Sequence, residues 1–390
     1  MKIKISDVVI CILLILGALT VINISFYHFY RSIFGACICM ILCCCCSARV
    51  FYGDNAKTIS LLICFFALNI LISIFNENAG IGATLNILLF ICLHILMKIN
   101  RVSPIVIKFL TCIYAIECLY IASISKGYGA LHWASYVDGS NAYVNTNYMS
   151  YMICIMSFQV WAYLKNTQFG HRVFGKAISA GLLILNIWAI SNLDSRSSYI
   201  AILFFFVLVY FYPNNLITKK NILLIYIFLL ALSIIVPIIY VYMYKSGITI
   251  NTVGAISKNT FTGRELIWSE YIRHFRGIKD WIFGLGSHTE IHGGADMHNM
   301  SLALIKNGGI ISALLVYVYI GKEITKCLDT TVTKEKFMYL AAVLASLAIG
   351  FFESTFLTSQ FFCIFTLLLY EASFTTEKLL LENEETYVDS

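Results

Sequence analysis

The chain has 390 residues, of which 59% are hydrophobic and only 12% are charged, and its mean hydropathy is +0.81. This composition excludes a soluble protein of two or three domains, which the length alone would suggest. The formal net charge of +6 bears on membrane topology rather than on nucleic acid, which is not an expected partner. Membrane lipids are therefore the expected surroundings.

Apolar stretches of roughly 17 to 25 residues recur along the chain, each long enough to cross about 30 Å of hydrocarbon as a helix. They predict an all-α polytopic integral membrane protein with about 12 transmembrane helices. The first stretch lacks a small-residue cleavage site and is interpreted as a membrane helix, not a presequence. The predicted spans are 8–30, 33–48, 58–75, 81–98, 104–124, 147–164, 177–192, 198–213, 222–243, 298–321, 337–354 and 360–374.

The 14 cysteines lie almost entirely inside these apolar stretches, including the run Cys43 to Cys46. The predicted external loops contain none. We interpret the cysteines as small, lipid-compatible helix residues rather than as disulfide, metal or redox groups. Palmitoylation of the run is the alternative interpretation.

The basic residues between the spans predict that both termini are cytoplasmic, because cytoplasmic connections carry an excess of lysine and arginine. The exception is the basic connection at 244–297, and long loops determine topology only weakly. The residues assigned to the cytoplasmic side are Lys2, Lys4, Arg49, Lys57, Lys98, Arg101, Lys165, Arg172, Lys176, Lys219, Lys220, Lys322, Lys326, Lys334, Lys336 and Lys378.

The domain prediction is a single polytopic membrane domain over 1–390, with a large periplasmic loop at 244–297 and a cytoplasmic tail at 375–390. Long loops in compact proteins are usually functional. A smaller external connection is predicted at 125–146. Apolar residues at helical spacing in 262–276 predict a helix along the membrane surface, and the acidic tail is interpreted as a short helix or a frayed end.

Polar residues predicted on the external side cluster at 141–147, 194–198 and 264–299. Arg196 lies in a short connection at the membrane edge. It is interpreted either as an arginine that reaches the lipid headgroups or as a guanidinium that binds phosphate with two hydrogen bonds. Arg264 has Trp268 four residues later on the same helical face. This pair fits a structural interface helix as well as it fits a functional arginine.

His298 opens an apolar span and is followed by Asn299. An imidazole titrates near neutral pH and is able to accept a proton from a hydroxyl, although a lone histidine at an interface is often structural. His288 and His292 lie nearby, but their spacing matches no zinc signature, so we predict no metal site.

A charged residue inside a span needs a polar partner, because an unpaired charge is costly in lipid. Lys306 falls within the span predicted at 298–321, and Glu353 is a candidate partner for a structural ion pair. Gly308 and Gly309 follow directly after this region. Such a pair permits close helix packing or a kink.

Five short motifs follow one another between about residues 140 and 320. They are Asn141-Ala-Tyr-Val-Asn-Thr-Asn147, Ser195-Arg196-Ser-Ser-Tyr, Gly263-Arg264-Glu-Leu-Ile-Trp268, Gly284-Leu-Gly286, and His298-Asn299 with Gly309. In this order they resemble the O-antigen polymerase and O-antigen ligase superfamily of bacterial envelope glycosyltransferases. Ser312 departs from the family pattern, which commonly ends in glycine, threonine or tyrosine.

The resemblance implies an integral-membrane C-type glycosyltransferase fold that uses sugars carried on undecaprenyl pyrophosphate and no cofactor or metal. Arg196 and Arg264 would stabilise the leaving diphosphate, and His298 would accept the proton of the attacking hydroxyl. The expected substrate-binding residues are Asn299, which would position the hydroxyl, Arg276 as an auxiliary, Asn147 and Ser195.

The expected function is an O-antigen polymerase of the bacterial inner membrane that joins undecaprenyl-pyrophosphate-linked repeat units at the periplasmic face. An O-antigen ligase, which transfers the polymer to lipid A core, is one alternative. A flippase for lipid-linked oligosaccharides is another, although flippases usually place charged sites near the membrane midplane and often contain duplicated halves. Further expected partners are a chain-length regulator and a flippase of the same pathway.

Overall fold

The computed structural model of the chain describes residues 5–19, 81–140, 143–167, 173–247, 263–286, 297–329, 332–355 and 358–388, and single positions between 57 and 67. The spans predicted at 33–48 and 58–75 lie outside these continuous ranges. Within the described residues all regular structure is helical. This confirms the predicted all-α class.

The described helices follow the order of the chain. They are α1 (Ile5–Leu19), α4 (Ile81–Asn100), α5 (Pro104–Ser125), α6 (Tyr128–Asp138), α7 (Thr146–Lys165), α9 (Val173–Leu193), α10 (Arg196–Phe206), the π-helix η1 (Val207–Phe211), the 3₁₀ helix η2 (Asn214–Leu216), α11 (Lys219–Lys245), α12 (Arg264–His274), α13 (Ile278–Phe283), α14 (Met300–Leu328), α15 (Lys334–Ile349) and α16 (Ser359–Val388).

Four of the described helices, α5, α9, α11 and α14, are long and apolar enough to cross a membrane. Shorter apolar helices lie at Asn86–Asn100, Arg196–Phe211 and Gln360–Phe374. On α11, large apolar side chains such as Phe228 (61% exposed) and Ile227 (59%) face outward, which is favourable only in apolar surroundings. The chain is therefore a helical membrane protein.

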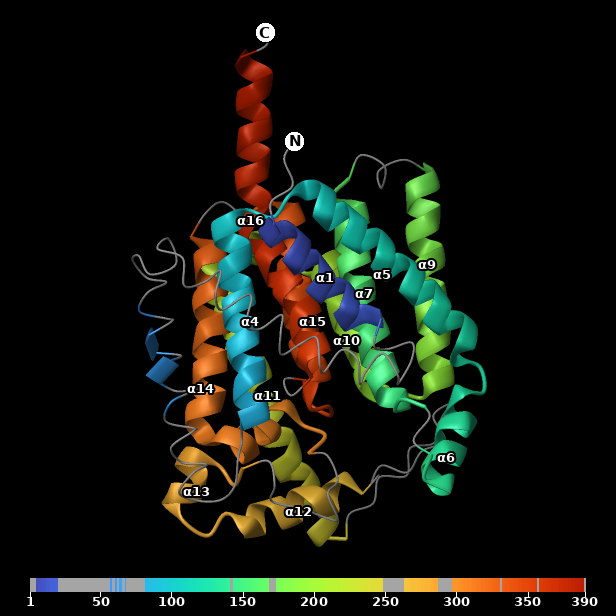
Figure 1. Cartoon of the computed structure of the whole chain (residues 1–390), viewed down its shortest axis with the longest axis vertical. Helices are drawn as coiled ribbons and strands as arrows, with labels where there is room; N and C mark the ends of the chain where they lie inside the picture. Colours follow the sequence, from blue (N-terminus) through green and yellow to red (C-terminus); the bar gives the residue numbers. More distant parts are fainter. Residues whose placement is uncertain are drawn as a thin grey trace.

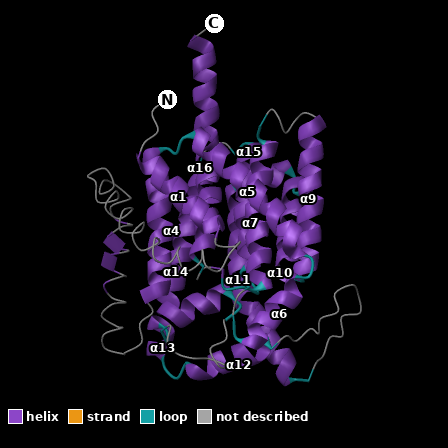
Figure 2. Ribbon diagram, turned by 45° about the vertical axis from the view of Figure 1, so that its right-hand side comes forward, coloured by secondary structure: helices purple, strands orange, loops and turns teal. Residues whose placement is uncertain are grey.

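The helices form a bundle in which α15 is central (Figure 1). α15 packs against α7, α10, α11 and α16, and its residues from Lys336 to Ile349 are all buried. α12, α13 and α6 lie at one end of the bundle, opposite the end from which α16 emerges (Figures 1 and 2). We call the end with α12 and α13 the site end and the opposite end the basic end.

The basic end takes its name from the lysines and arginines at the helix termini that meet there. α1 begins at this end, and α4, α7 and α14 finish there (Figure 1). The site end carries basic residues too, and they are Lys126, Arg196, Lys245, Arg264, Arg273, Arg276 and Lys279. The basic residues that the chain direction puts at the basic end are Lys98, Arg101, Lys165, Lys176, Lys219, Lys220, Lys322, Lys326, Lys334 and Lys336.

Buried polar contacts join α4 to α14 near the basic end. The Nδ1 atom of His94 lies 2.8 Å from the hydroxyl of Tyr319. One carboxylate oxygen of Glu323 accepts a hydrogen bond from Lys98, and the other accepts one from Lys326 at 3.2 Å. Since Glu323 is only 3% exposed, these two cations balance a charge that would be costly to bury alone.

Three sequence-based boundaries differ from the structure. The external connection predicted at 125–146 contains the helix α6. The tail after residue 375 is helical, as one of its two interpretations expected, but it continues α16 to Val388 and does not begin a new helix. α14 extends beyond the predicted span to Leu328, and it has the kink that Gly308 and Gly309 were expected to permit, with non-helical backbone angles at both residues.

Candidate functional site

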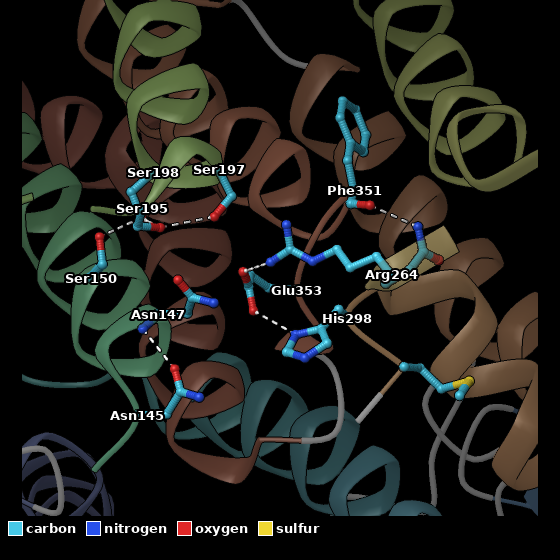
Figure 3. Close-up of polar contacts among 12 residues, drawn as sticks. Asn145, Asn147, Ser150, Ser195, Ser197, Ser198, Arg264, His298, Phe351 and Glu353 are labelled. Carbon is cyan, nitrogen blue, oxygen red and sulfur yellow. Dashed lines mark hydrogen bonds and ion pairs between the residues drawn. The ribbon is translucent and has the colours of Figure 1, made fainter. Parts of the chain in front are cut away.

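At the site end, Arg264 and His298 both contact the carboxylate of Glu353. One oxygen of Glu353 accepts a hydrogen bond from Nη2 of Arg264 at 2.9 Å, and the other lies 3.5 Å from Nδ1 of His298. The three residues come from the loop after α15, the first turn of α12 and the loop before α14 (Figure 3). We call this cluster the Arg264–Glu353–His298 triad.

The triad is only partly accessible. The side chain of Glu353 is 5% exposed, whereas those of Arg264 and His298 are 17% and 24% exposed. The guanidinium of Arg264 also lies 5.8 Å from the ring centre of Phe352, within cation–π range. The guanidinium and the imidazole therefore reach the surface in part, while the carboxylate between them is buried.

His298 is held by hydrogen bonds to its two neighbours in the chain. The indole N–H of Trp268 donates to the backbone oxygen of Met297 at 2.7 Å, and the following residue, Asn299, is completely buried. His298 itself has a φ of +46°, a left-handed conformation that costs a residue with a Cβ about 1 to 3 kcal/mol. Such strain persists only where the surroundings fix the backbone, as they do here.

The carboxamide of Asn299 is fully used by the protein. Its oxygen caps α14 by accepting from the Leu302 N–H at 2.9 Å, and its nitrogen donates to the backbone oxygens of Ser233 at 2.7 Å and Phe351 at 2.9 Å. One side chain thus joins α11, α14 and the loop that carries Glu353. The geometry supports a positioning role for Asn299, in place of the substrate contact expected from the sequence.

α12 forms where the apolar periodicity predicted a helix, and it packs against α11. Trp268 and Tyr271 are completely buried on its inner face, whereas Leu266 and Ile272 are about two-fifths exposed. Burial raises the pKa of Tyr271 well above its usual value, so its phenol stays neutral. Trp268, which was predicted to share a helical face with Arg264, stabilises the loop before α14 through its hydrogen bond to Met297.

Two glycine motifs meet where α13 contacts the kink of α14. The backbone N–H groups of Leu285 and Gly286 donate to the oxygen of Lys306 at 2.7 and 3.1 Å. A Cβ on Gly309 would lie 1.9 Å from the oxygen of Ile282, and one on Gly284 would lie 2.7 Å from the nitrogen of Gly309. Only glycine permits this backbone-to-backbone contact, which fixes the part of α14 that follows His298.

Arg196 begins α10 and is half-buried, next to a cluster of buried serines. The Ser195 hydroxyl lies 3.1 Å from that of Ser197 and 3.3 Å from that of Ser198, which accepts from Ser150 of α7 at 2.9 Å. These contacts fix the start of α10 against α7. Because α10 also packs antiparallel to α15, its first turn lies at the end of α15 that leads to Glu353.

Asn147 and Arg276 have different relations to the triad. Figure 3 shows the carboxamide of Asn147 turned toward Glu353 from the α7 side, while its backbone N–H is bound by the side chain of Asn145, which caps α7. Arg276 is exposed between α12 and α13, and its backbone N–H binds Asp280 at 3.0 Å. His288 and His292, considered as metal ligands, lie outside the described residues.

Glu353 is the member of the triad that the sequence motifs did not identify. The sequence suggested it as a partner for Lys306, and this was wrong, since its carboxylate pairs with Arg264 and His298. It lies 55 residues from His298 and 89 from Arg264 in the chain. An acidic residue at the external end of a predicted span was the available signal, because such charges are rarely without function.

The described part of the chain holds no group of three histidine, cysteine or acidic side chains able to bind a metal ion. What it does hold at the site end is a guanidinium, a carboxylate and an imidazole in contact. This set is suited to binding an anionic group and to moving a proton at an adjacent hydroxyl.

The fold and this site define a helical membrane protein with a polar cluster at one end of its bundle. Comparison of the chain with known protein families, curated proteins and solved structures gives no match. A function for the chain is therefore inferred from the geometry and from the motif order.

Proposed function

We propose that this protein is a polysaccharide polymerase, a glycosyltransferase that joins undecaprenyl-pyrophosphate-linked repeat units at the outer face of a bacterial inner membrane. The observation that carries the proposal is the contact of Arg264 and His298 through Glu353. The two residues belong to motifs 34 positions apart in the chain, and each has the chemistry that one half of the reaction needs.

The reaction needs a cation at the leaving group and a proton acceptor at the attacking group. As the bond from the anomeric carbon to the phosphate oxygen breaks, negative charge develops on the diphosphate, and Arg264 with Arg196 would stabilise it. The acceptor sugar hydroxyl attacks the anomeric carbon and gives its proton to His298. The diphosphate leaves with the bonding electron pair and remains attached to its polyprenyl chain.

Further residues have supporting roles in this proposal. Asn299 positions His298 through its hydrogen bonds to the surrounding backbone. Ser195 fixes the first turn of α10, where Arg196 lies, and Asn147 faces the bound sugars from α7. Arg276, which is exposed at the edge of the site end, attracts the anionic headgroup before it reaches the triad. No cofactor or metal takes part.

The topology that this function requires puts the site end in the periplasm and both termini in the cytoplasm, with about 12 spans. Support comes from the basic end, where lysines and arginines gather at the helix termini as they do on cytoplasmic surfaces. In this arrangement 244–297 is a large periplasmic loop and 375–390 a cytoplasmic tail. The polyprenyl chain then stays in the lipid beside the bundle, while the glycan extends from the site end.

The test compares surface glycan length in cells that carry Arg264→Ala, Arg196→Ala or His298→Ala, with membrane protein levels checked. Matched controls on α12 are Arg273→Ala, at an exposed position, and His274→Ala, whose Nδ1 atom lies 2.9 Å from the backbone oxygen of Glu270 on the same helix. We expect the three site variants to attach single repeats only, and the controls to give chains of normal length.

Other outcomes would select the alternatives. Accumulation of full-length polymer on its lipid carrier would select a ligase that uses lipid A core as the acceptor. Movement of the lipid-linked oligosaccharide across vesicles, without any joining of sugars by purified protein, would select a flippase. Normal chain length in all three site variants at normal protein levels would refute the proposed site.

A further inference from the structure

Glu353 lies between the two groups that the proposed reaction uses, and it engages each with a different oxygen. Oε1 accepts from Arg264 at 2.9 Å, and Oε2 lies 3.5 Å from Nδ1 of His298. The carboxylate is 5% exposed, so solvent screens these contacts little. A buried carboxylate needs such partners, and a change at one partner is felt at the other.

Arg264 has two competing anions in the proposed reaction. Its Nη2 atom is bonded to Glu353, while the proposed donor brings a diphosphate with more negative charge than one carboxylate. A guanidinium binds phosphate oxygens with two parallel hydrogen bonds, which is stronger than a single contact. The diphosphate is therefore expected to draw Arg264 away from Glu353, and its charge also repels that carboxylate.

When Arg264 moves from Glu353 to the diphosphate, the electrostatic effect of Glu353 on His298 changes. While the guanidinium is bound, it neutralises the carboxylate. Once it has moved, the negative charge faces the imidazole alone and stabilises the imidazolium that forms when His298 takes a proton, as a buried carboxylate does for a catalytic histidine. The tautomer with hydrogen on Nδ1 donates to Glu353 and leaves Nε2 free to accept that proton.

We propose that Glu353 couples donor binding to proton transfer. It holds Arg264 while the site is empty, and it supports His298 as the proton acceptor once a lipid-linked diphosphate has bound Arg264. This inference rests on the proposed function. The reaction is otherwise unchanged: the hydroxyl oxygen bonds to the anomeric carbon, the carbon–phosphate oxygen bond breaks, the proton goes to Nε2 of His298, and the diphosphate leaves with the electron pair.

The coupling predicts an unusual pair of effects for Glu353→Gln. The amide keeps the shape of the side chain but lacks its charge, so it holds Arg264 less strongly and cannot stabilise an imidazolium. Binding of the diphosphate should therefore become tighter, while sugar transfer becomes slower. A merely structural role would weaken both. Glu353→Asp, which keeps the charge on a shorter side chain, should recover part of the transfer rate.

The experiment uses the full chain in nanodiscs, with undecaprenyl pyrophosphate as the binding probe and a lipid-linked repeat unit for single-turnover transfer. For Glu353→Gln we expect the dissociation constant of the probe to fall about fivefold or more and the transfer rate to fall about 100-fold. The matched control is Glu335→Gln on the first turn of α15, at the basic end. It should change neither value.

A double-mutant cycle with Arg264→Gln separates this coupling from a general disturbance. Glu353→Gln should no longer tighten binding when Arg264 is already replaced, because the two changes act through one contact. Weaker probe binding by Glu353→Gln, or the same tightening in the Arg264→Gln background, would overturn the inference. Thermal unfolding of each variant identifies any that fail to fold, and Glu353→Asp then provides the comparison.

The results also distinguish this inference from the proposed function. If the unaltered protein binds the probe but joins no sugars, while Glu353→Gln still binds it more tightly, the proposed function fails and the competition for Arg264 stands. If the unaltered protein joins sugars and Glu353→Gln does so at the same rate, the coupling fails and the proposed function stands.

Discussion

Replacing Gly309 with alanine should separate α13 from α14 and destabilise the protein. The new Cβ would lie 1.9 Å from the oxygen and 2.3 Å from the carbonyl carbon of Ile282, and 2.5 Å from the nitrogen of Phe283. All three atoms are backbone, so no side-chain rotation relieves the clash. Gly309 also has φ +71° and ψ −175°, a region that is nearly restricted to glycine.

The two effects are of similar size. The backbone strain costs about 1 to 3 kcal/mol and the overpacking about 1 to 3 kcal/mol, which gives about 2 to 6 kcal/mol together. For the purified protein in detergent, the midpoint of thermal unfolding should fall by about 2 to 7 °C. Circular dichroism at the aromatic wavelengths measures this midpoint, and it also reports the packing of Trp281 on Phe275, whose ring centres are 4.3 Å apart.

The matched control is Gly181→Ala on α9, where an added Cβ has no atom within 4 Å. This position is in an exposed helix interior, and alanine there should leave the midpoint unchanged or raise it slightly. If Gly309→Ala unfolds at the same temperature as Gly181→Ala, the contact between α13 and the α14 kink does not stabilise the fold.

Three further changes test the supports of the site and of the basic end. Trp268→Phe removes the hydrogen bond to Met297 and should lower the free energy of unfolding in detergent by about 1 kcal/mol. Surface glycans should also become shorter, because the loop that carries His298 loses this contact. Asn299→Asp keeps the α14 cap but buries a charge and loses two donated bonds, so the yield of folded protein should fall sharply, whereas a normal yield would contradict the supporting role of Asn299. Lys98→Met leaves the buried Glu323 carboxylate with one cation in place of two and should cost about 3 kcal/mol; Lys326→Met, at a 37% exposed position, should cost clearly less in the same unfolding assay.

The helical membrane class followed from the sequence because it depends on segment length and hydropathy alone. A stretch such as 222–243 can satisfy its backbone groups in lipid only as a helix, and α11 forms there. The helix α12 was likewise predicted by the spacing of Leu266, Ile267 and Tyr271. The helix α6 lies in a connection that was expected to be a loop, because its 11 residues are too few to be recognised as a membrane span.

Motif reading identified Arg264 and His298 but not what lies between them. The sequence analysis paired Glu353 with Lys306 on the assumption that two opposite charges in neighbouring spans form an ion pair. In the structure the loop after α15 carries Glu353 to Arg264 and His298 instead. A pairing of this kind depends on backbone positions that a charge pattern does not contain.

The sequence by itself determined that this chain is helical and lies in a membrane, since those properties are sums over local residues: apolar length, helical spacing and the distribution of lysine and arginine. Only the tertiary structure decided that Arg264, Glu353 and His298 share one contact and that Asn299 is a support for His298. These facts depend on the packing of α11, α12, α14 and α15 across long separations in the chain, and no local pattern of residues specifies which side chains such packing brings together.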